Sequence, residues 1–261
     1  MAIGDDARVT TFVLLVVAGV GAGLTGSIAG LASLISYPAL LAAGLPPIPA
    51  NVTNTVALVF SGVGSVSASR PELRNQSRRL RRLVLAAVAG GTLGAYLLIR
   101  TPSNAFEKIV PVLIAVASVA VMIRRSPTDL AAHHAGSIAP SRDSWWLAAA
   151  TFGIGIYGGY FGAAAGVLLL ALILLATGEL LPRSNAIKNV LLGSANLVAA
   201  TGFVLFAHVA WLSALPLAIG VLVGARIGPR IVRRVPATGL RMVIGACGLG
   251  LAIYLGVGAY Q

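Results

Sequence analysis

The sequence predicts an all-α fold, a polytopic helical membrane protein, on three observations. Hydrophobic side chains make up 57% of the 261 residues, charged side chains make up only 10%, and the mean hydropathy is +0.92. A soluble domain carries roughly 25% charged residues, so the composition excludes an ordinary soluble enzyme, a disordered chain and a disulfide scaffold. The apolar stretches are continuous rather than alternating with polar residues, which argues against a membrane β-barrel.

Apolar segments divide the chain into candidate membrane elements. Six of them fit a single crossing of about 20 residues, and they cover 52–69, 83–99, 106–123, 187–207, 212–228 and 239–259. Two others, 9–43 and 145–177, are too long for one crossing and are interrupted by glycine. Because glycine loosens a helix and permits a tight turn, we expect each of these two to form a hairpin of short helices or a re-entrant pair.

The order of these elements occurs twice. A shift of 134 residues places Gly44 on Gly178, Asn51 on Asn185 and Val56 on Val190. Each half then contains a Gly-rich hairpin, a polar break and three helices. Since that makes five elements per half, an odd number, we expect two inverted repeats. The expected domains are a first transmembrane repeat (1–123), a cytoplasmic linker (124–144) and a second, inverted transmembrane repeat (145–261).

The placement of arginine predicts the orientation. Cytoplasmic loops of membrane proteins carry an excess of Lys and Arg. If both long segments cross twice, 16 of the 19 basic residues lie inside or at inner helix ends, and Arg8, Arg100 and Lys108 stay outside. This predicts ten elements in the cell membrane with both termini outside. The net charge of +12 then does not indicate nucleic-acid binding, because the basic residues sit between apolar runs and are not interleaved with aromatics.

Inverted repeats with broken helices are typical of secondary transporters, whose substrate binds near the middle of the membrane. In both halves, prolines after the hairpin stop the helix, and Asn51 or Asn185 would be a favourable N-cap for the next helix. A helix N-terminus binds anions, so two such ends could converge on one substrate. Simple capping is the alternative for either asparagine alone.

Polar side chains that continue into the apolar helices are the candidates for substrate binding. Buried amides are unfavourable unless they are paired, and an ionisable side chain inside a membrane helix indicates function. Lys188 could instead extend to the interface, and the tyrosines could be interface anchors. The candidate residues are Asn51, Thr53, Asn54, Asn185, Lys188, Asn189, Asn196, Ser33, Tyr37 and Tyr160.

Several kinds of chemistry have no counterpart in the sequence. No carboxylate lies in the middle of an apolar segment, which argues against a cation substrate. There is no P-loop, no spacing of metal ligands and no evident nucleophile or acid–base set. We therefore expect no enzymatic activity, cofactor or metal. The expected partners are a small anion and the lipid bilayer, and a homodimer is left open.

Five stretches of the chain resemble one known family. They are Gly30–Pro38, Ala50–Leu58, Arg70–Leu73, Gly155–Gly162 and Asn185–Asn189, and they resemble the two halves of the TauE/SafE sulfite exporter family (DUF81). Many members have three glycines in the first hairpin, where this chain has Leu31-Ala32-Ser33. The family's motif positions fall on Asn51, Thr53 and Asn54 in the first half and on Asn185, Lys188 and Asn189 in the second.

The resemblance implies a bacterial cell-membrane permease for sulfite, sulfonates, sulfoacetate or related small organic anions, usually moving them outward. Together with the repeats, it leads us to expect an exporter that works by alternating access around a central site between the two halves. The alternatives are an anion channel or facilitator and a non-transporting accessory membrane subunit.

Overall fold

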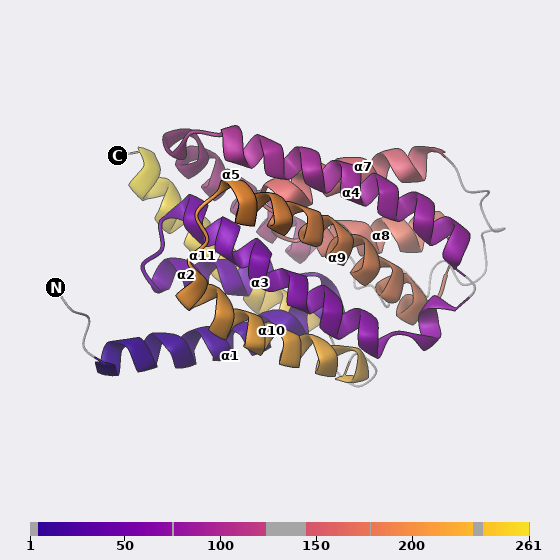
Figure 1. The fold of residues 1–261 in the computed structure, drawn as a ribbon, viewed down its shortest axis with the longest axis horizontal. Coiled ribbons are helices and arrows are strands. Elements are labelled where there is room, and N and C mark those ends of the chain that lie inside the picture. The colour runs from indigo at the N-terminus through magenta and orange to yellow at the C-terminus, as the bar shows by residue number, and fades with distance from the viewer. Residues whose placement is uncertain (1–4, 75, 124–144, 178, 232–236, 261) are drawn as a thin grey trace.

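The computed structural model describes residues 5–74, 76–123, 145–177, 179–231 and 237–260. In this part of the chain every regular element is a helix (Figure 1). A short 3-10 helix, η1 (Pro71–Leu73), follows the third α-helix. The α-helices are α1 (Asp5–Ala29), α2 (Ser33–Ala42), α3 (Pro47–Ala68), α4 (Ser77–Arg100), α5 (Ser103–Ile123), α7 (Trp145–Tyr160), α8 (Ala165–Thr177), α9 (Leu181–Phe206), α10 (Trp211–Ile231) and α11 (Ala237–Tyr260).

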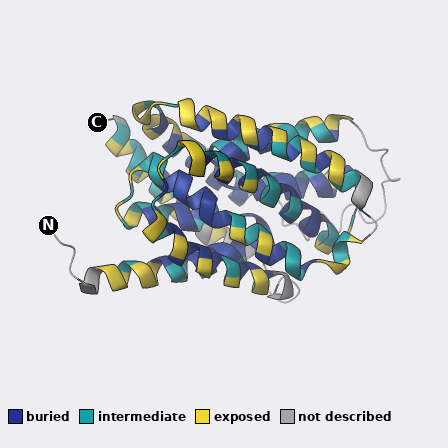
Figure 2. Cartoon of the chain, in the orientation of Figure 1, coloured by how far each residue is buried: buried dark blue, intermediate teal, exposed yellow. Residues whose placement is uncertain are grey.

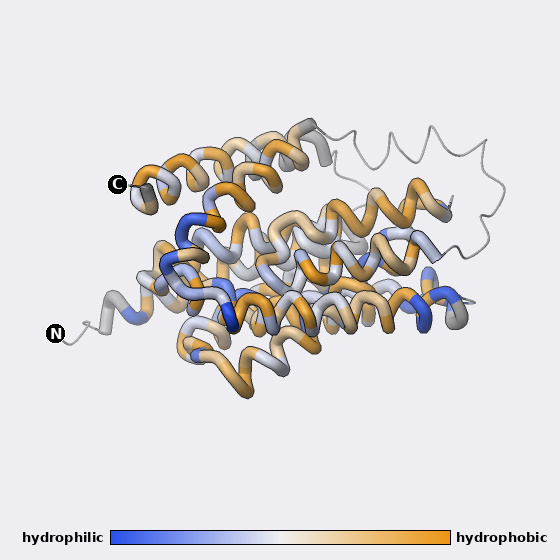
Figure 3. Tube along the Cα trace, turned by 90° about the horizontal axis from the view of Figure 1, so that it is seen from above, coloured by the Kyte–Doolittle hydropathy of each residue, from blue (hydrophilic) through white to orange (hydrophobic). Residues whose placement is uncertain are grey.

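The surface of the bundle suits lipid rather than water. Five of the described helices, α1, α4, α5, α9 and α10, are long and apolar enough to cross a membrane. Large apolar side chains point outward, among them Leu85, which is 70% exposed, and Leu212, which is 91% exposed. Exposed residues follow the outer faces of the helices (Figure 2), and hydrophobic residues occur along most of the length of the bundle (Figure 3). The chain is a multi-pass membrane protein.

Both long Gly-rich segments break into two helices, but only the second is a pair of short helices as predicted; in the first, α1 is 25 residues long and can cross a membrane alone. The first contains α1 and α2, and the second contains α7 and α8. The chain bends at Gly30 (φ +77°) and Gly162 (φ +74°), in the left-handed region that side chains with a Cβ disfavour. A Cβ on Gly30 would also lie 2.3 Å from the backbone of Gly166. Glycine thus makes the bend and brings the two hairpins into contact.

Helices from the two halves of the chain are interleaved. α1 packs on α10, α4 packs on α7, and α3 and α9 meet in the middle. Thr53 contacts Ala210, just beyond the end of α9, whereas Gly62 lies against Gly193, so α3 and α9 run antiparallel. The linker expected at 124–144 lies outside the described residues, and the division into domains stays a prediction.

Candidate functional site

A polar cavity of about 30 Å³ lies where the two hairpin bends meet α3 and α9. Such a volume holds about two water molecules, so the cavity is small. None of the residues that line it carries a charge. They are Gly26, Gly30, Ala32 and Ser33 from the first hairpin, Gly158, Phe161 and Gly162 from the second, Thr55, Leu58, Ser61, Gly62 and Ser65 from α3, and Asn189, Leu192, Gly193 and Asn196 from α9.

The helices α3 and α9 contribute equivalent positions to this cavity. The shift that aligns Asn51 with Asn185 also aligns three lining pairs, which are Thr55 with Asn189, Leu58 with Leu192 and Gly62 with Asn196. Along each helix these positions recur every three or four residues and therefore share one face. That spacing is the signal that could have added Ser61 and Ser65 to the candidates, which sequence reasoning missed.

Asn189 places an unpaired donor at the cavity. The residue is 5% exposed, and its Nδ2 is buried without a hydrogen-bond partner among the described residues. The same cavity is lined by Ala32 and Ser33, where α2 begins. The N–H groups of Leu34 and Ile35 donate to the carbonyls of Leu31 and Ala32, and the start of a helix carries a partial positive charge. The cavity therefore combines neutral hydrogen-bond donors with a positive helix end.

Asn51 and Asn185 connect the two halves rather than lining the cavity. Asn51 Nδ2 donates to the carbonyl of Tyr160 at 2.8 Å, and Asn185 Nδ2 donates to the carbonyl of Ser27 at 2.9 Å. Each carbonyl belongs to the last turn of a hairpin's first helix, where carbonyl groups lack intrahelical donors. The two equivalent asparagines thus satisfy the broken ends of the opposite hairpin.

The expectation that these asparagines are N-caps is wrong. The N-caps of α3 and α9 are Pro46 and Leu180. Each helix has a proline in its first turn, Pro47 in α3 and Pro182 in α9, where proline's fixed φ favours the start of a helix. Both helices therefore begin about one turn earlier than the sequence suggested, and both asparagines lie inside them.

Lys188 lies directly behind the wall of the cavity. It is fully buried, and its Nζ donates to the carbonyls of Gly26 at 3.0 Å and Ser27 at 3.3 Å. A cation at the C-terminal end of a helix is favourable, and these carbonyls belong to the end of α1. Lys188 is not among the lining residues, but its bonded partner Gly26 and its neighbour Asn189 are. The side chain does not extend to the interface.

The remaining predicted site residues divide by location. Ser33 and Asn196 line the cavity with Asn189. Asn54 donates to Ser33 Oγ at 3.3 Å and accepts from Ser36 Oγ, so it fixes the start of α2. Thr53 Oγ1 accepts from the backbone N–H of Ala210 at 3.1 Å, just before α10. Tyr160 packs on an aromatic ring and Tyr37 lines a separate cavity.

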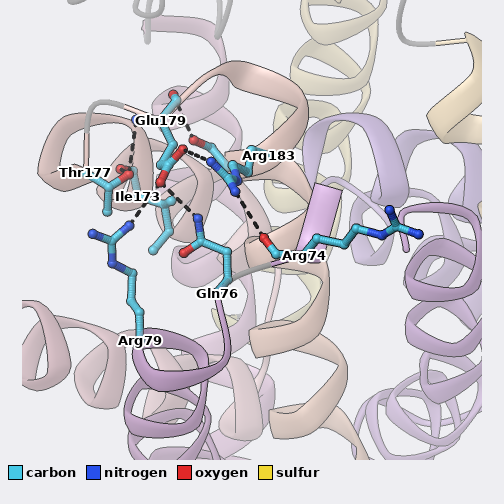
Figure 4. A network of polar contacts seen from close by, with 8 residues as sticks. Arg74, Gln76, Arg79, Ile173, Thr177, Glu179 and Arg183 are labelled. Carbon is cyan, nitrogen blue, oxygen red and sulfur yellow. Dashed lines mark hydrogen bonds and ion pairs between the residues drawn. The ribbon is translucent and has the colours of Figure 1, made fainter. Parts of the chain in front are cut away.

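A network of charged side chains joins the halves at the end of the bundle where α3 leads into α4 (Figure 4). Glu179 accepts from Gln76 at 3.0 Å, from Arg79 at 3.2 Å and from Arg183 at 3.1 Å. Arg183 also donates to the carbonyl of Arg74 at 3.0 Å. The position equivalent to Glu179 in the first half is Leu45, so this carboxylate is confined to one end.

The amino-acid sequence matches one known family over most of its length. The model described as "Sulfite exporter TauE/SafE" matches residues 15–255. The chain belongs to the TauE/SafE family. Membership in this family of membrane transporters is consistent with a protein that is not an enzyme.

Curated relatives in the TauE/SafE family carry general names. "Probable membrane transporter protein ORF9" of Sinorhizobium sp is 30% identical over 92% of this chain and 90% of its own length. YfcA of Escherichia coli K12, with the same general name, is 28% identical over 81% and 77%. A Haemophilus influenzae relative, "Probable membrane transporter protein", is 26% identical over 92% of each chain. No solved structure matches the chain.

Proposed function

We propose that this chain exports a small anion, such as sulfite, a sulfonate or a sulfoacetate-like organic anion, across the cell membrane. The observation that carries the proposal is the buried, unpaired Nδ2 of Asn189 at a cavity without carboxylates. An unpaired buried donor is unfavourable, and an anion that accepts its hydrogen bond removes that penalty. The start of α2 and the charge of Lys188 behind the wall favour the same sign of ligand.

Alternating access is the mechanism that the repeats support. Equivalent residues of the two halves line the cavity, and α3 and α9, which supply them, run antiparallel. Two units related in this way can exchange conformations and open a central site to either side in turn. The contact between Gly30 and Gly166 lets one hairpin move against the other without side chains between them.

Flux measurement on the purified full-length chain tests this function. The chain is reconstituted in liposomes loaded with sulfite, with a C2 sulfonate or with sulfoacetate, and efflux is followed after dilution. We expect saturable efflux of at least one anion about tenfold above that from protein-free vesicles, as binding to a central site requires. Liposomes loaded with choline or sodium instead of the anion serve as the cation control. Efflux of every anion at the rate of empty vesicles, in any imposed gradient, contradicts the proposal.

A further inference from the structure

A second, larger cavity lies at the end of the bundle opposite the Glu179 network. Its volume is about 500 Å³, which is in the range of ordinary ligand pockets. It lies between α2, the start of α3, the first turns of α5 and the last turns of α11 (Figure 1). Its lining includes Tyr37, Glu107, Val110, Tyr254 and Val257.

Tyr37 gives this cavity an unpaired donor. The residue is 1% exposed, and its hydroxyl group is buried without a hydrogen-bond partner among the described residues. Tyr37 lines the wall, which is otherwise largely apolar, so its buried hydroxyl group is a donor that a small movement of the side chain would present to the cavity. At the mouth, Tyr254 is 76% exposed, as expected of a tyrosine at the membrane–water interface.

Two aromatic side chains in contact connect the wall of this cavity to the wall of the central one. Tyr37 packs edge-on against Phe161, with ring centroids 5.3 Å apart. Tyr37 lines the larger cavity, and Phe161 lines the central cavity. Phe106, fully buried, packs on Phe161 at 6.2 Å and on Tyr160 at 5.9 Å. Asn51 holds the carbonyl of Tyr160, so the position of this aromatic barrier depends on a bond between the halves.

We propose that the larger cavity is the outer vestibule of the transport path, a second and weaker site for the exported anion, with the Tyr37 hydroxyl group as its donor. The Tyr37–Phe161 pair is the barrier that opens between the two sites. Glu107, which is exposed at the vestibule, keeps anion binding there weak by charge repulsion, which favours release over recapture. The inference rests on the proposed function, because it takes the exported anion as the ligand.

Thiol accessibility tests the vestibule without any need for transport. In a Cys247→Ser background, Val110→Cys places a thiol in the cavity wall, and Ile114→Cys places one a turn further along α5, where it is equally buried but does not line this cavity. A membrane-impermeant sulfonate-bearing methanethiosulfonate, added from outside, should modify Val110→Cys about tenfold faster. Glu107→Gln should raise the rate of this anionic reagent and lower that of a cationic analogue. Equal rates of thiol modification at positions 110 and 114 overturn the assignment of this cavity as a vestibule.

Flux tests the role of the hydroxyl group. Tyr37→Phe keeps the ring and removes the donor, so anion efflux should fall about tenfold, the effect of losing one hydrogen bond to a charged group. Tyr96→Phe, an exposed tyrosine on α4, is the matched control and should keep wild-type flux. Wild-type flux in Tyr37→Phe overturns the assignment of Tyr37. If the wild-type chain moves no anion while Val110→Cys is modified, the proposed function fails and the outside-accessible cavity stands.

Discussion

Asn189 and Lys188 are adjacent in the sequence but do different work. Lys188 Nζ donates to the carbonyls of Gly26 and Ser27, so its amino group holds the end of α1 behind the cavity wall. Asn189 has no such partner for its Nδ2 and lines the cavity itself. Of these two side chains, only Asn189 lines the cavity, so its amide is the group that can contact the anion.

Asn189→Leu should abolish much of the transport while leaving the fold intact. The substitution removes a hydrogen bond to a charged ligand, worth about 1.5–3 kcal/mol or about ten- to hundredfold in affinity. It also removes a buried, unpaired donor, so thermal stability in detergent should stay the same or rise. Asn104→Leu, at the exposed start of α5, is the control for flux. Wild-type anion affinity in Asn189→Leu would exclude Asn189 from the site.

The hairpins and the charged network are the elements that can differ between two conformations. Glu179, in the short connection between α8 and α9, holds Arg79 at the start of α4, and both side chains are 20% exposed. The network therefore ties the two halves together at one end of the bundle. The vestibule leaves the other end more open. We infer that this conformation is closed at the end of the bundle that holds the Glu179 network.

Glu179→Gln should shift the population toward a state that is open at that end. Only the Arg79–Glu179 ion pair joins the two halves, and a partly exposed pair contributes up to about 1 kcal/mol, so the open state should become at most about fivefold more populated. In the Cys247→Ser background, Ser184→Cys reports on this, because Ser184 is fully buried beside the network. A membrane-impermeant thiol reagent should modify it faster from the cytoplasmic side in Glu179→Gln. Glu107→Gln, at the other end of the bundle, should leave the modification rate of Ser184→Cys unchanged. If Glu179→Gln also leaves that rate unchanged, the network does not close the path.

At the scale of the whole molecule, composition and hydropathy were enough to predict an all-helical membrane protein with two broken hairpins, because lipid exposure requires long apolar helices. The contacts of individual side chains were not predictable in the same way. Asn51 and Asn185 bind residues about 110 and 160 positions away, and no local pattern encodes such partners. The aromatic barrier was missed for the same reason, since Tyr37 and Phe161 meet only through tertiary packing.

The opposite orientation of the two halves has a sharp test at one pair of equivalent positions. The shift of 134 residues places Arg74, after η1, on His208, between α9 and α10, and both are exposed. If the repeats are inverted and the arginine clusters are cytoplasmic, these residues lie on opposite sides of the membrane. In the Cys247→Ser background, an impermeant thiol reagent added to whole cells should modify His208→Cys at once and Arg74→Cys only after permeabilisation. Ser103→Cys, at the start of α5, should behave like His208→Cys. Modification of both equivalent positions from the same side would mean that the halves are parallel, and a shared central site that alternates between the two faces would then have no structural basis.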